Sequence, residues 1–316
     1  MARSPLFRNM GAPHPERAPL AARRYHGPAF MDVSVIIPTY NRRPLLLLAL
    51  RSVLDQTSPP REILVVDDGS SDGTKEALES VQGIRVLTQA NAGAAAARNL
   101  GLRSASCPWV AFLDSDDLWE PTKLEKQIAA HSAHPERRWV ICDSRSIRED
   151  GSPLRGHQKP LHGGAITTAL FQHTFVHTPS VLAERALLLD LGGFDESLRV
   201  CEDLDLWLRA SLESEVVAVH EPLFLRRVHA NSLAHTDNPE HHEDKCRVLE
   251  RFAQLPRAQA LLSSWVRNKR LARVHFLAAR AWRRHLDQNR AHAHLKRSRA
   301  LCPLHPRYWP ILSSVS

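Results

Sequence analysis

Short runs of β-branched and aliphatic residues alternate with longer, helically periodic stretches from residue 33 onward. Buried strands are predicted over residues 33–37, 62–66, 84–87, 109–113 and 139–143. Helices are predicted between them, over residues 44–56, 72–81, 92–105 and 118–133. Strands separated by helices form βαβ units, so the pattern predicts an α/β fold with a mostly parallel central sheet flanked by helices.

The second half of the chain has a less regular pattern. Helices are predicted over residues 163–175, 184–191 and 204–211, and strands over residues 179–183 and 216–219. From about residue 236 the spacing is helical to the end of the chain. We therefore predict an α/β domain over residues 31–235 and a helical C-terminal extension over residues 236–316.

Residues 1–30 are rich in Pro, Arg, Ala and Gly and show no apolar periodicity. They contain no continuous apolar segment of the kind found in a secretory signal. Met31 stands immediately before the first predicted strand. The segment is therefore interpreted either as a disordered leader or as sequence that lies upstream of a start at Met31.

Composition narrows the class of partner. The chain has 316 residues, of which 43% are hydrophobic, enough to bury a substantial core without disulfides. A net charge of +8 favours anionic partners such as nucleoside diphosphates, lipid head groups or nucleic acid. Nucleic-acid binders interleave basic residues with aromatic ones, and only 6% of this chain is aromatic, so nucleic acid is not an expected partner.

Cysteine usage and hydropathy bear on the compartment. Five cysteines are dispersed without C-x-x-C spacing, which predicts a reducing compartment rather than a disulfide framework or a zinc site. No apolar run reaches the roughly 18 residues that span a bilayer. The predicted location is the cytoplasm. The basic residues after Arg267 either hold the chain at the inner face of the membrane or form a solvated helical face.

Three polar clusters follow the first, second and fourth predicted strands, at residues 38–41, 67–70 and 114–117. The carboxyl ends of parallel strands meet at one edge of a sheet, where ligands collect in such folds. We therefore expect all three clusters to face one crevice.

Asp114, Asp116 and Asp117 place three carboxylates within four residues. Such groups repel one another and lose solvation when buried, so a compensating charge is needed. A hard divalent cation, completed by diphosphate oxygens, supplies that charge. The alternative is a helix N-terminus, which favours Asp but requires only one. The cluster therefore predicts a metal site.

Other polar residues allow two interpretations each. Arg98 lies among alanines, and its planar guanidinium suits a diphosphate, while the small residues around it allow close packing of a helix on the sheet. Glu202 and Asp203 precede an amphipathic helix, so they either cap it or supply a general base for an acceptor hydroxyl. Asp68 either shapes a turn or contacts a nucleotide.

Six segments, taken in order, resemble the family 2 glycosyltransferases over residues 33–232. The segments are V-S-V-I-I-P-T-Y-N from residue 33, D-D-G-S from 67, A-R-N-L-G from 97, D-S-D from 114, G-G-F-D from 192 with E-D at 202, and R-V-H-A-N-S from 227. The resemblance implies a GT-A fold, in which a Rossmann-like nucleotide-binding half is joined to an acceptor half.

The resemblance also implies a role for each matching residue. The nucleotide and donor contacts it implies are Pro38, Thr39, Tyr40, Asn41, Asp67, Asp68, Arg98, Asp114 and Ser115, with Asp68 the direct contact of its motif. The metal ligands it implies are Asp116, Asp114 and His229. The acceptor side it implies contains Asp195 and Glu202, with Asp203 as the catalytic base.

The function implied by this resemblance is metal-dependent transfer, with Mn²⁺ or Mg²⁺ as cofactor and inversion at the anomeric carbon. A UDP-sugar is the expected donor, and a glycan or lipid-linked hydroxyl the expected acceptor, in cell-surface polysaccharide or glycolipid synthesis. Two alternatives stay open. One is a catalytically inactive domain that binds a partner. The other is a sugar nucleotidyltransferase, which should carry a Gly-rich, basic loop where this chain has P-T-Y-N.

Overall fold

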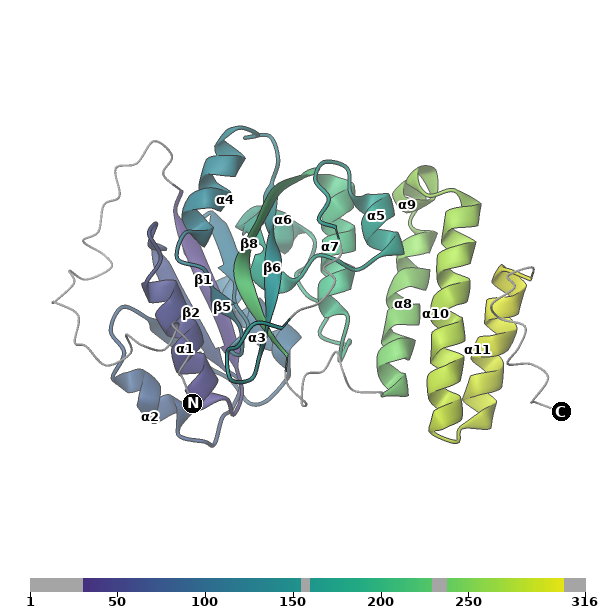
Figure 1. The fold of residues 1–316 in the computed structure, drawn as a ribbon, viewed down its shortest axis with the longest axis horizontal. Helices are drawn as coiled ribbons and strands as arrows, with labels where there is room; N and C mark the ends of the chain where they lie inside the picture. Colours follow the sequence, from purple (N-terminus) through teal and green to yellow (C-terminus); the bar gives the residue numbers. More distant parts are fainter. Residues whose placement is uncertain (1–30, 155–159, 229–237, 304–316) are drawn as a thin grey trace.

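An eight-stranded sheet organises the computed structural model, which describes residues 31–154, 160–228 and 238–303 (Figure 1). Its strands are β1 (Val33–Thr39), β2 (Glu62–Asp67), β3 (Arg85–Thr88), β4 (Trp109–Phe112), β5 (Leu118–Trp119), β6 (Trp139–Arg148), β7 (Leu182–Glu184) and β8 (Val216–Val228). Their order across the sheet is β3-β2-β1-β4-β7-β6-β8-β5. The pairs β1–β2, β1–β4, β2–β3 and β6–β8 are parallel. The pairs β4–β7, β6–β7 and β5–β8 are antiparallel. The predicted α/β class is confirmed.

Helices cover both faces of this sheet. They are α1 (Arg43–Leu54), α2 (Thr74–Glu79), α3 (Ala94–Ser104), α4 (Lys123–Ser132), α5 (Thr167–Gln172), α6 (Arg185–Asp190) and α7 (Glu202–Glu213), with a 3₁₀ helix η3 (Thr178–Ser180). Successive side chains of a strand point to opposite faces. In β1, Val35 and Ile37 accordingly share a core cluster with Leu50 of α1, whereas Ile36 shares one with Trp207 of α7.

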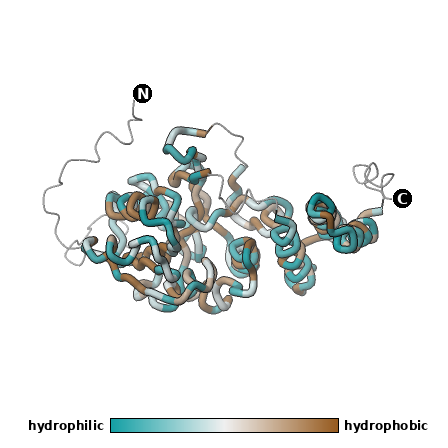
Figure 2. Tube along the Cα trace, turned by 90° about the horizontal axis from the view of Figure 1, so that it is seen from below, coloured by the Kyte–Doolittle hydropathy of each residue, from teal (hydrophilic) through white to brown (hydrophobic). Residues whose placement is uncertain are grey.

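Four further helices follow the sheet domain and form the helical extension. They are α8 (Pro239–Gln254), α9 (Pro256–Leu261), α10 (Ser264–Arg284) and α11 (Gln288–Leu301). In both views α10 and α11 lie at the end of the molecule farthest from β1 (Figures 1 and 2). Buried residues of α8 and α10, such as Phe252 and Leu271, belong to the same core cluster as Ile36. No described helix is both long and apolar enough to cross a membrane.

Two element boundaries differ from the prediction for reasons that involve proline. The predicted helix over residues 118–133 begins only at Lys123, because Leu118 and Trp119 pair with β8 as strand β5 and Pro121 disfavours helical backbone before it. The predicted strand over residues 216–219 continues to Val228. Pro222 lies where the register of β6 and β8 shifts, which is where a strand tolerates proline.

The less regular segment before α7 also differs from the prediction. The helix predicted over residues 163–175 is limited to α5, and the strand predicted over residues 179–183 is replaced by η3 followed by β7. Short elements of this kind are set by tertiary contacts, so the local pattern does not fix their ends.

Candidate active site

Hydrogen bonds join the loops that follow β1 and β2. The backbone N–H of Asn41 donates to Ser70 Oγ (2.9 Å), and the N–H of Ser71 donates to Asn41 Oδ1 (2.7 Å). The N–H of Asp68 donates to the carbonyl of Thr39 at 2.9 Å. Because β1 and β2 are parallel neighbours, two of the three predicted clusters therefore lie side by side at one edge of the sheet.

The end of β1 turns from core to solvent within four residues. Pro38 and Thr39 are buried, whereas Tyr40 is 46% exposed. Within the described part of the chain, the buried Oγ1 of Thr39 has no hydrogen-bond partner. A buried hydroxyl without a partner is costly, and a bound polar ligand removes that cost.

Asp67 and Asp68 both stabilise loop backbone. Asp68 accepts hydrogen bonds from Gln89 Nε2 (2.7 Å) and from the N–H groups of Ala92 (2.9 Å) and Gly93 (2.8 Å). Asp67 Oδ1 accepts from the N–H of Ser70 at 3.0 Å. The carboxylate of Asp68, which the resemblance assigns to the nucleotide, thus also holds the loop that leads into α3.

The loop after β4 carries the third predicted cluster, and arginines from other elements neutralise it. Arg98 Nη2 of α3 lies 2.7 Å from Asp114 Oδ1. Arg42, which precedes α1, forms an ion pair with Asp116. The two carboxyl groups that are predicted metal ligands are therefore each paired with a guanidinium group in this structure. They are joined to the β1 loop through Arg42.

Pairing of β5 with β8 fixes the end of the same loop. The N–H of Arg227 on β8 donates to Asp117 Oδ1 at 2.8 Å, and Arg227 Nε donates to the carbonyl of Asp116 at 3.0 Å. Burial, followed by the charges of Asp116 and Asp114, raises the pKa of Asp117. Ser115 is buried between these acids. The R-V-H motif thus begins against the acidic loop.

Arg98 joins the acidic loop to the start of α7. Its Nη1 lies 2.7 Å from Glu202 Oε1, while its Nη2 binds Asp114. Burial lowers the pKa of Arg98, but the charges of Asp114 and Glu202 outweigh burial, so the pKa is raised. Its buried Nε has no hydrogen-bond partner among the described residues. Arg98 is thus a buried cation that stays charged.

Asp203 follows Glu202 in the first turn of α7. Burial, followed by the charge of Glu202, raises the pKa of Asp203 to about 7, although its Oδ1 accepts a hydrogen bond from the N–H of Leu204 at 2.6 Å. A carboxyl group with this pKa can take up and release a proton near neutral pH. The pKa of Asp203 therefore lies in the range where a carboxyl group can exchange a proton at neutral pH.

Strained backbone occurs on both sides of this cluster. Asn41 has φ +49° and Cys201 has φ +64°, and Leu286 is the third described non-glycine residue with positive φ. Such conformations cost free energy and often mark functional segments. Cys201 is the residue before α7, so its conformation sets the direction in which Glu202 and Asp203 leave the loop.

The A-R-N-L-G segment has three distinct roles in the structure. Arg98 enters the acidic cluster, and Asn99 accepts from the N–H of Phe194 (2.9 Å) and donates to the carbonyl of Phe194 (2.8 Å). Gly101 lies against β1, where an added Cβ would come within 2.4 Å of Ile36 Cγ2. The motif therefore ties the sheet to the G-G-F-D segment.

Asp195 links the G-G-F-D segment to the helical extension. Its Oδ2 lies 2.8 Å from Arg251 Nη1 of α8, and Arg251 Nη2 lies 2.6 Å from the buried Asp205 of α7. Asp205 also pairs with Arg209 at 2.6 Å. Asp195 is thus anchored to α8, whereas Glu202 is paired with Arg98 of the acidic cluster.

We define the strand-end site as Asp114, Asp116, Asp117, Glu202 and Asp203 together with Arg42 and Arg98. Its donors are carboxylate oxygens, which suit Mg²⁺ or Mn²⁺. Among the described residues these oxygens do not form a closed group of three ligands. His229, the third predicted ligand, lies outside the described residues.

Sequence reasoning missed two cations of this region. Arg42 is separated from Asp116 by 74 positions, and its place directly after P-T-Y-N was the available signal. Lys245 of α8 lies near Cys201 and Asp203. Burial lowers the pKa of Lys245. No local pattern marks Lys245, because the fold alone brings α8 to α7.

Comparison with known proteins places this geometry in a family. The model described as Glycosyl transferase family 2 matches residues 34–187. The putative teichuronic acid biosynthesis glycosyltransferase TuaG of Bacillus subtilis is 48% identical over 183 residues, which cover 56% of this chain and 70% of TuaG. The Escherichia coli UDP-Glc:alpha-D-GlcNAc-diphosphoundecaprenol beta-1,3-glucosyltransferase WfgD is 29% identical over 259 residues, which cover 78% of this chain and 90% of WfgD. The chain spans about a third of the length of the first curated relatives that it matches.

Solved structures match the fold. S. aureus TarS 1–349 superposes with a TM-score of 0.64 at 20% identity, covering 86% of this chain and 81% of TarS, and the same TarS segment has been solved with UDP-GlcNAc. The mannosyltransferase PcManGT of Pyrobaculum calidifontis, in complex with GDP-Man and Mn²⁺, has a TM-score of 0.60 at 19% identity, covering 89% of this chain and 80% of PcManGT. The sheet and its helices therefore have the GT-A architecture.

Proposed function

The chain belongs to glycosyl transferase family 2, and from this premise we propose that it moves a sugar from a nucleoside diphosphate sugar to an acceptor hydroxyl with inversion at the anomeric carbon. The observation that carries the proposal is the position of Arg98, which joins Asp114 to Glu202 beside Asp203. A cation for the leaving diphosphate and a base for the attacking hydroxyl then adjoin each other.

The donor side lies at the ends of β1, β2 and β4. Asp114 and Asp116 would hold a Mg²⁺ or Mn²⁺ ion, with His229 as a further ligand, and the bound ion supplies positive charge to the diphosphate oxygens. The Mn²⁺ in PcManGT supports this choice of cofactor. Arg98 adds a permanent charge on the same side, and the residues 38–41 and 67–68 enclose the nucleotide.

The chemical step is a single displacement. The acceptor oxygen attacks the anomeric carbon while the bond from that carbon to the diphosphate oxygen breaks, and the nucleoside diphosphate leaves. Asp203 takes the proton of the acceptor hydroxyl, so its carboxylate must be ionised at the start of the step. Glu202 holds Arg98 in place through their ion pair.

The relatives support a more specific proposal for donor and acceptor. WfgD uses UDP-Glc and a diphosphoundecaprenol-linked acceptor, and TarS binds UDP-GlcNAc. We therefore assign a UDP-sugar donor and a glycan or lipid-linked acceptor to this chain, in cell-envelope synthesis. A lipid-linked acceptor requires work at a membrane surface, which we place at the cytoplasmic face, with the basic α10 and α11 toward anionic lipid.

Thermal unfolding with nucleotides tests the donor site first. The melting temperature of the chain is measured with UDP, GDP, ADP or CDP, each with Mn²⁺, with Mg²⁺ or with a chelator. A ligand that binds only the folded state raises the melting temperature, so UDP with metal should raise it most. The Asp116→Ala chain should lose this rise, because it lacks a metal ligand.

The same experiment distinguishes the alternatives. A rise that is largest for another nucleotide would replace the UDP assignment and keep the enzyme class. A folded chain that responds to none of the nucleotides, with or without metal, would overturn the proposed donor site. If one nucleotide binds, transfer to a lipid-linked acceptor is tested with sugars of that nucleotide only.

A further inference from the structure

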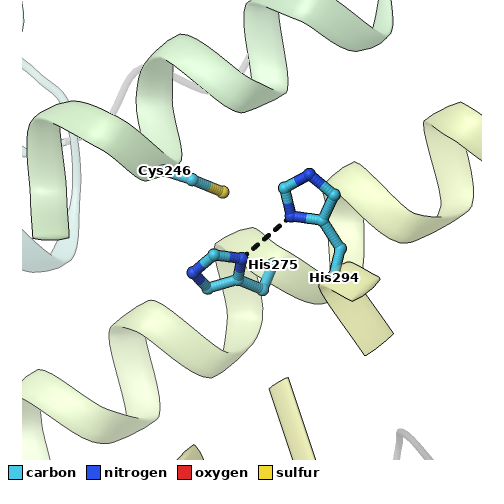
Figure 3. A group of neighbouring side chains, drawn as sticks. All are labelled: Cys246, His275 and His294. Atoms are coloured by element: carbon cyan, nitrogen blue, oxygen red, sulfur yellow. Dashed lines mark hydrogen bonds between the residues drawn. The ribbon is translucent and has the colours of Figure 1, made fainter. Parts of the chain in front are cut away.

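Three side chains from three different helices converge within the helical extension (Figure 3). They are Cys246 of α8, His275 of α10 and His294 of α11, and we call them the Cys-His cluster. One possible ligand atom of each lies within 4.8 Å of the others. Cys246 and His275 are buried, and the side chain of His294 is 15% exposed. The cluster shares no residue with the strand-end site.

The two imidazole rings face each other through the same atom. His275 Nδ1 lies 2.9 Å from His294 Nδ1, and the sulfur of Cys246 points toward both rings (Figure 3). On their far sides the rings face carboxylates. His275 Nε2 lies 3.2 Å from Glu250 Oε1, and His294 Nε2 lies 3.4 Å from Glu243 Oε1.

This orientation defines where the ring protons belong. A nearby carboxylate favours a proton on a ring nitrogen. His294 Nε2 is hydrogen-bonded to Glu243 Oε1, whereas His275 Nε2 lies at ion-pair distance from Glu250 but makes no hydrogen bond among the described residues. When both Nε2 atoms carry a proton, each Nδ1 atom presents its lone pair. The two Nδ1 lone pairs then face each other at 2.9 Å and need a positive charge between them. A proton or a metal ion can supply that charge.

The surroundings favour the metal over the proton. A shared proton makes one ring an imidazolium at a place where His275 is buried and the side chain of His294 is only 15% exposed. A proton between the rings also leaves the converging sulfur of Cys246 without a role.

We propose that Cys246, His275 and His294 bind one Zn²⁺ ion through Sγ and the two Nδ1 atoms. Imidazole and thiolate are the ligands that zinc prefers, and a carboxylate commonly receives the second N–H of a zinc-bound histidine. On binding, the thiol proton leaves to solvent and a zinc–sulfur bond forms. Three protein ligands leave the fourth tetrahedral position for a water molecule.

The role of this ion is structural. Hydrophobic packing between α11 and α10 depends on a small cluster, in which Ala272 and Phe276 contact Leu295 and Leu301. The zinc ion adds a direct connection from α11 to α8, and α8 belongs to the core of the sheet domain. Loss of the ion should therefore loosen α11 before the sheet.

Cobalt substitution in the full-length chain tests the proposal. The chain is freed of metal with a chelator and titrated with Co²⁺, and absorption from cobalt–thiolate charge transfer is recorded. One equivalent should produce this absorption, and one equivalent of Zn²⁺ should remove it. The ligands proposed for the strand-end site are carboxylate oxygens and the imidazole of His229, with no thiolate among them, so that site contributes no thiolate signal even where it binds cobalt.

Variants locate the ligands. Cys246→Ser and His294→Gln should abolish the cobalt–thiolate absorption and the rise in melting temperature on adding Zn²⁺. Cys302→Ser and His292→Gln replace residues of the same types in the extension and should keep both. A folded wild-type chain that gives no thiolate absorption and retains no zinc overturns the proposal without any variant. Absorption that survives in Cys246→Ser overturns it as well.

Discussion

The strand-end site and the Cys-His cluster both gather ionisable side chains, but they balance charge differently. Asp114 and Asp116 are each paired with an arginine from another element of the sheet domain. In the Cys-His cluster, nitrogen and sulfur donor atoms face one another, and the carboxylates lie behind the rings. Oxygen donors already balanced by arginines suit an ion that arrives with its diphosphate, whereas converging nitrogen and sulfur donors suit an ion that stays.

The largest effect is expected at Asp203, the proposed base of the strand-end site. Asp203→Asn removes the proposed base and should lower kcat by about 10²- to 10⁴-fold, while the affinity for nucleotide and metal changes little. Steady-state kinetics and calorimetric titration of UDP measure the two quantities. Asp190→Asn replaces an exposed acid at the end of α6 and should leave both unchanged. Near-normal turnover by Asp203→Asn would falsify the base assignment.

The second prediction uses pH. Burial, followed by the charge of Glu202, raises the pKa of Asp203 to about 7, while the Leu204 N–H and Arg98 act in the opposite direction and Asp114 adds to the rise. A base works only when deprotonated, so kcat should be constant above pH 7 and fall about tenfold per pH unit below it.

Neutralising one neighbour sharpens this pH test. Glu202→Gln removes the charge that raises the pKa of Asp203, so the midpoint should move to lower pH. Initial rates at saturating substrate between pH 5 and 9 measure both midpoints. Rates of the wild-type chain that stay flat down to pH 5 would contradict the raised pKa.

The same contrast explains what sequence could predict. Asp114, Arg98 and Asp203 each lie within a contiguous motif, and the alternation of strands and helices confirmed here determines that β1, β2 and β4 end at one edge. The partner of Asp116 was not predictable, because Arg42 comes from a separate loop. The residues of the Cys-His cluster lie on three different helices and do not follow any recognised metal-ligand spacing along the chain. The five dispersed cysteines of the chain led to the prediction of no zinc site, and the convergence of Cys246 with two histidines argues against that prediction.

Two predicted ends of helices or strands differ from the structure because of contacts with a neighbouring strand. Leu118 and Trp119 satisfy a helical pattern, but pairing with Phe224 and Leu225 stabilises them as a strand. Proline stops a strand prediction, yet a register shift accommodates Pro222 within β8. Both deviations bring the acidic loop against Arg227, so the parts that local patterns miss are parts that shape the site.

The third prediction concerns how the site is held. Gly192 and Gly193 have φ +82° and φ +72°, so alanine is strained at both. Only at Gly193 would the new Cβ meet another residue, Asn99 Oδ1 at 2.4 Å. Gly192→Ala should lower the free energy of unfolding by about 1 kcal/mol, and Gly193→Ala by about 1–3 kcal/mol more. Denaturant unfolding measures both, and equal losses would show that the contact with Asn99 is unimportant.

The smallest effect is expected at Arg251, and its measurement tests whether the helical extension and the sheet domain unfold together. Arg251 joins α8 to Asp195 and to the buried Asp205, but about half of its side chain is exposed, so solvent screens the pairs. When Arg251 is replaced, Asp205 still has its ion pair with Arg209. Arg251→Met should therefore lower the free energy of unfolding by about 1 kcal/mol.

A more exposed pair, which also joins the extension to the sheet domain, provides the control for Arg251. Arg257→Met removes an exposed pair with Glu213 and should cost about 0.5 kcal/mol or less. Calorimetry should show one transition for each variant, because α8 and α10 share the hydrophobic core of the sheet domain. A separate, earlier transition in Arg251→Met would mean that the ion pairs, rather than the shared core, couple the extension to the sheet domain. The Cys-His cluster would then belong to an independently folding unit.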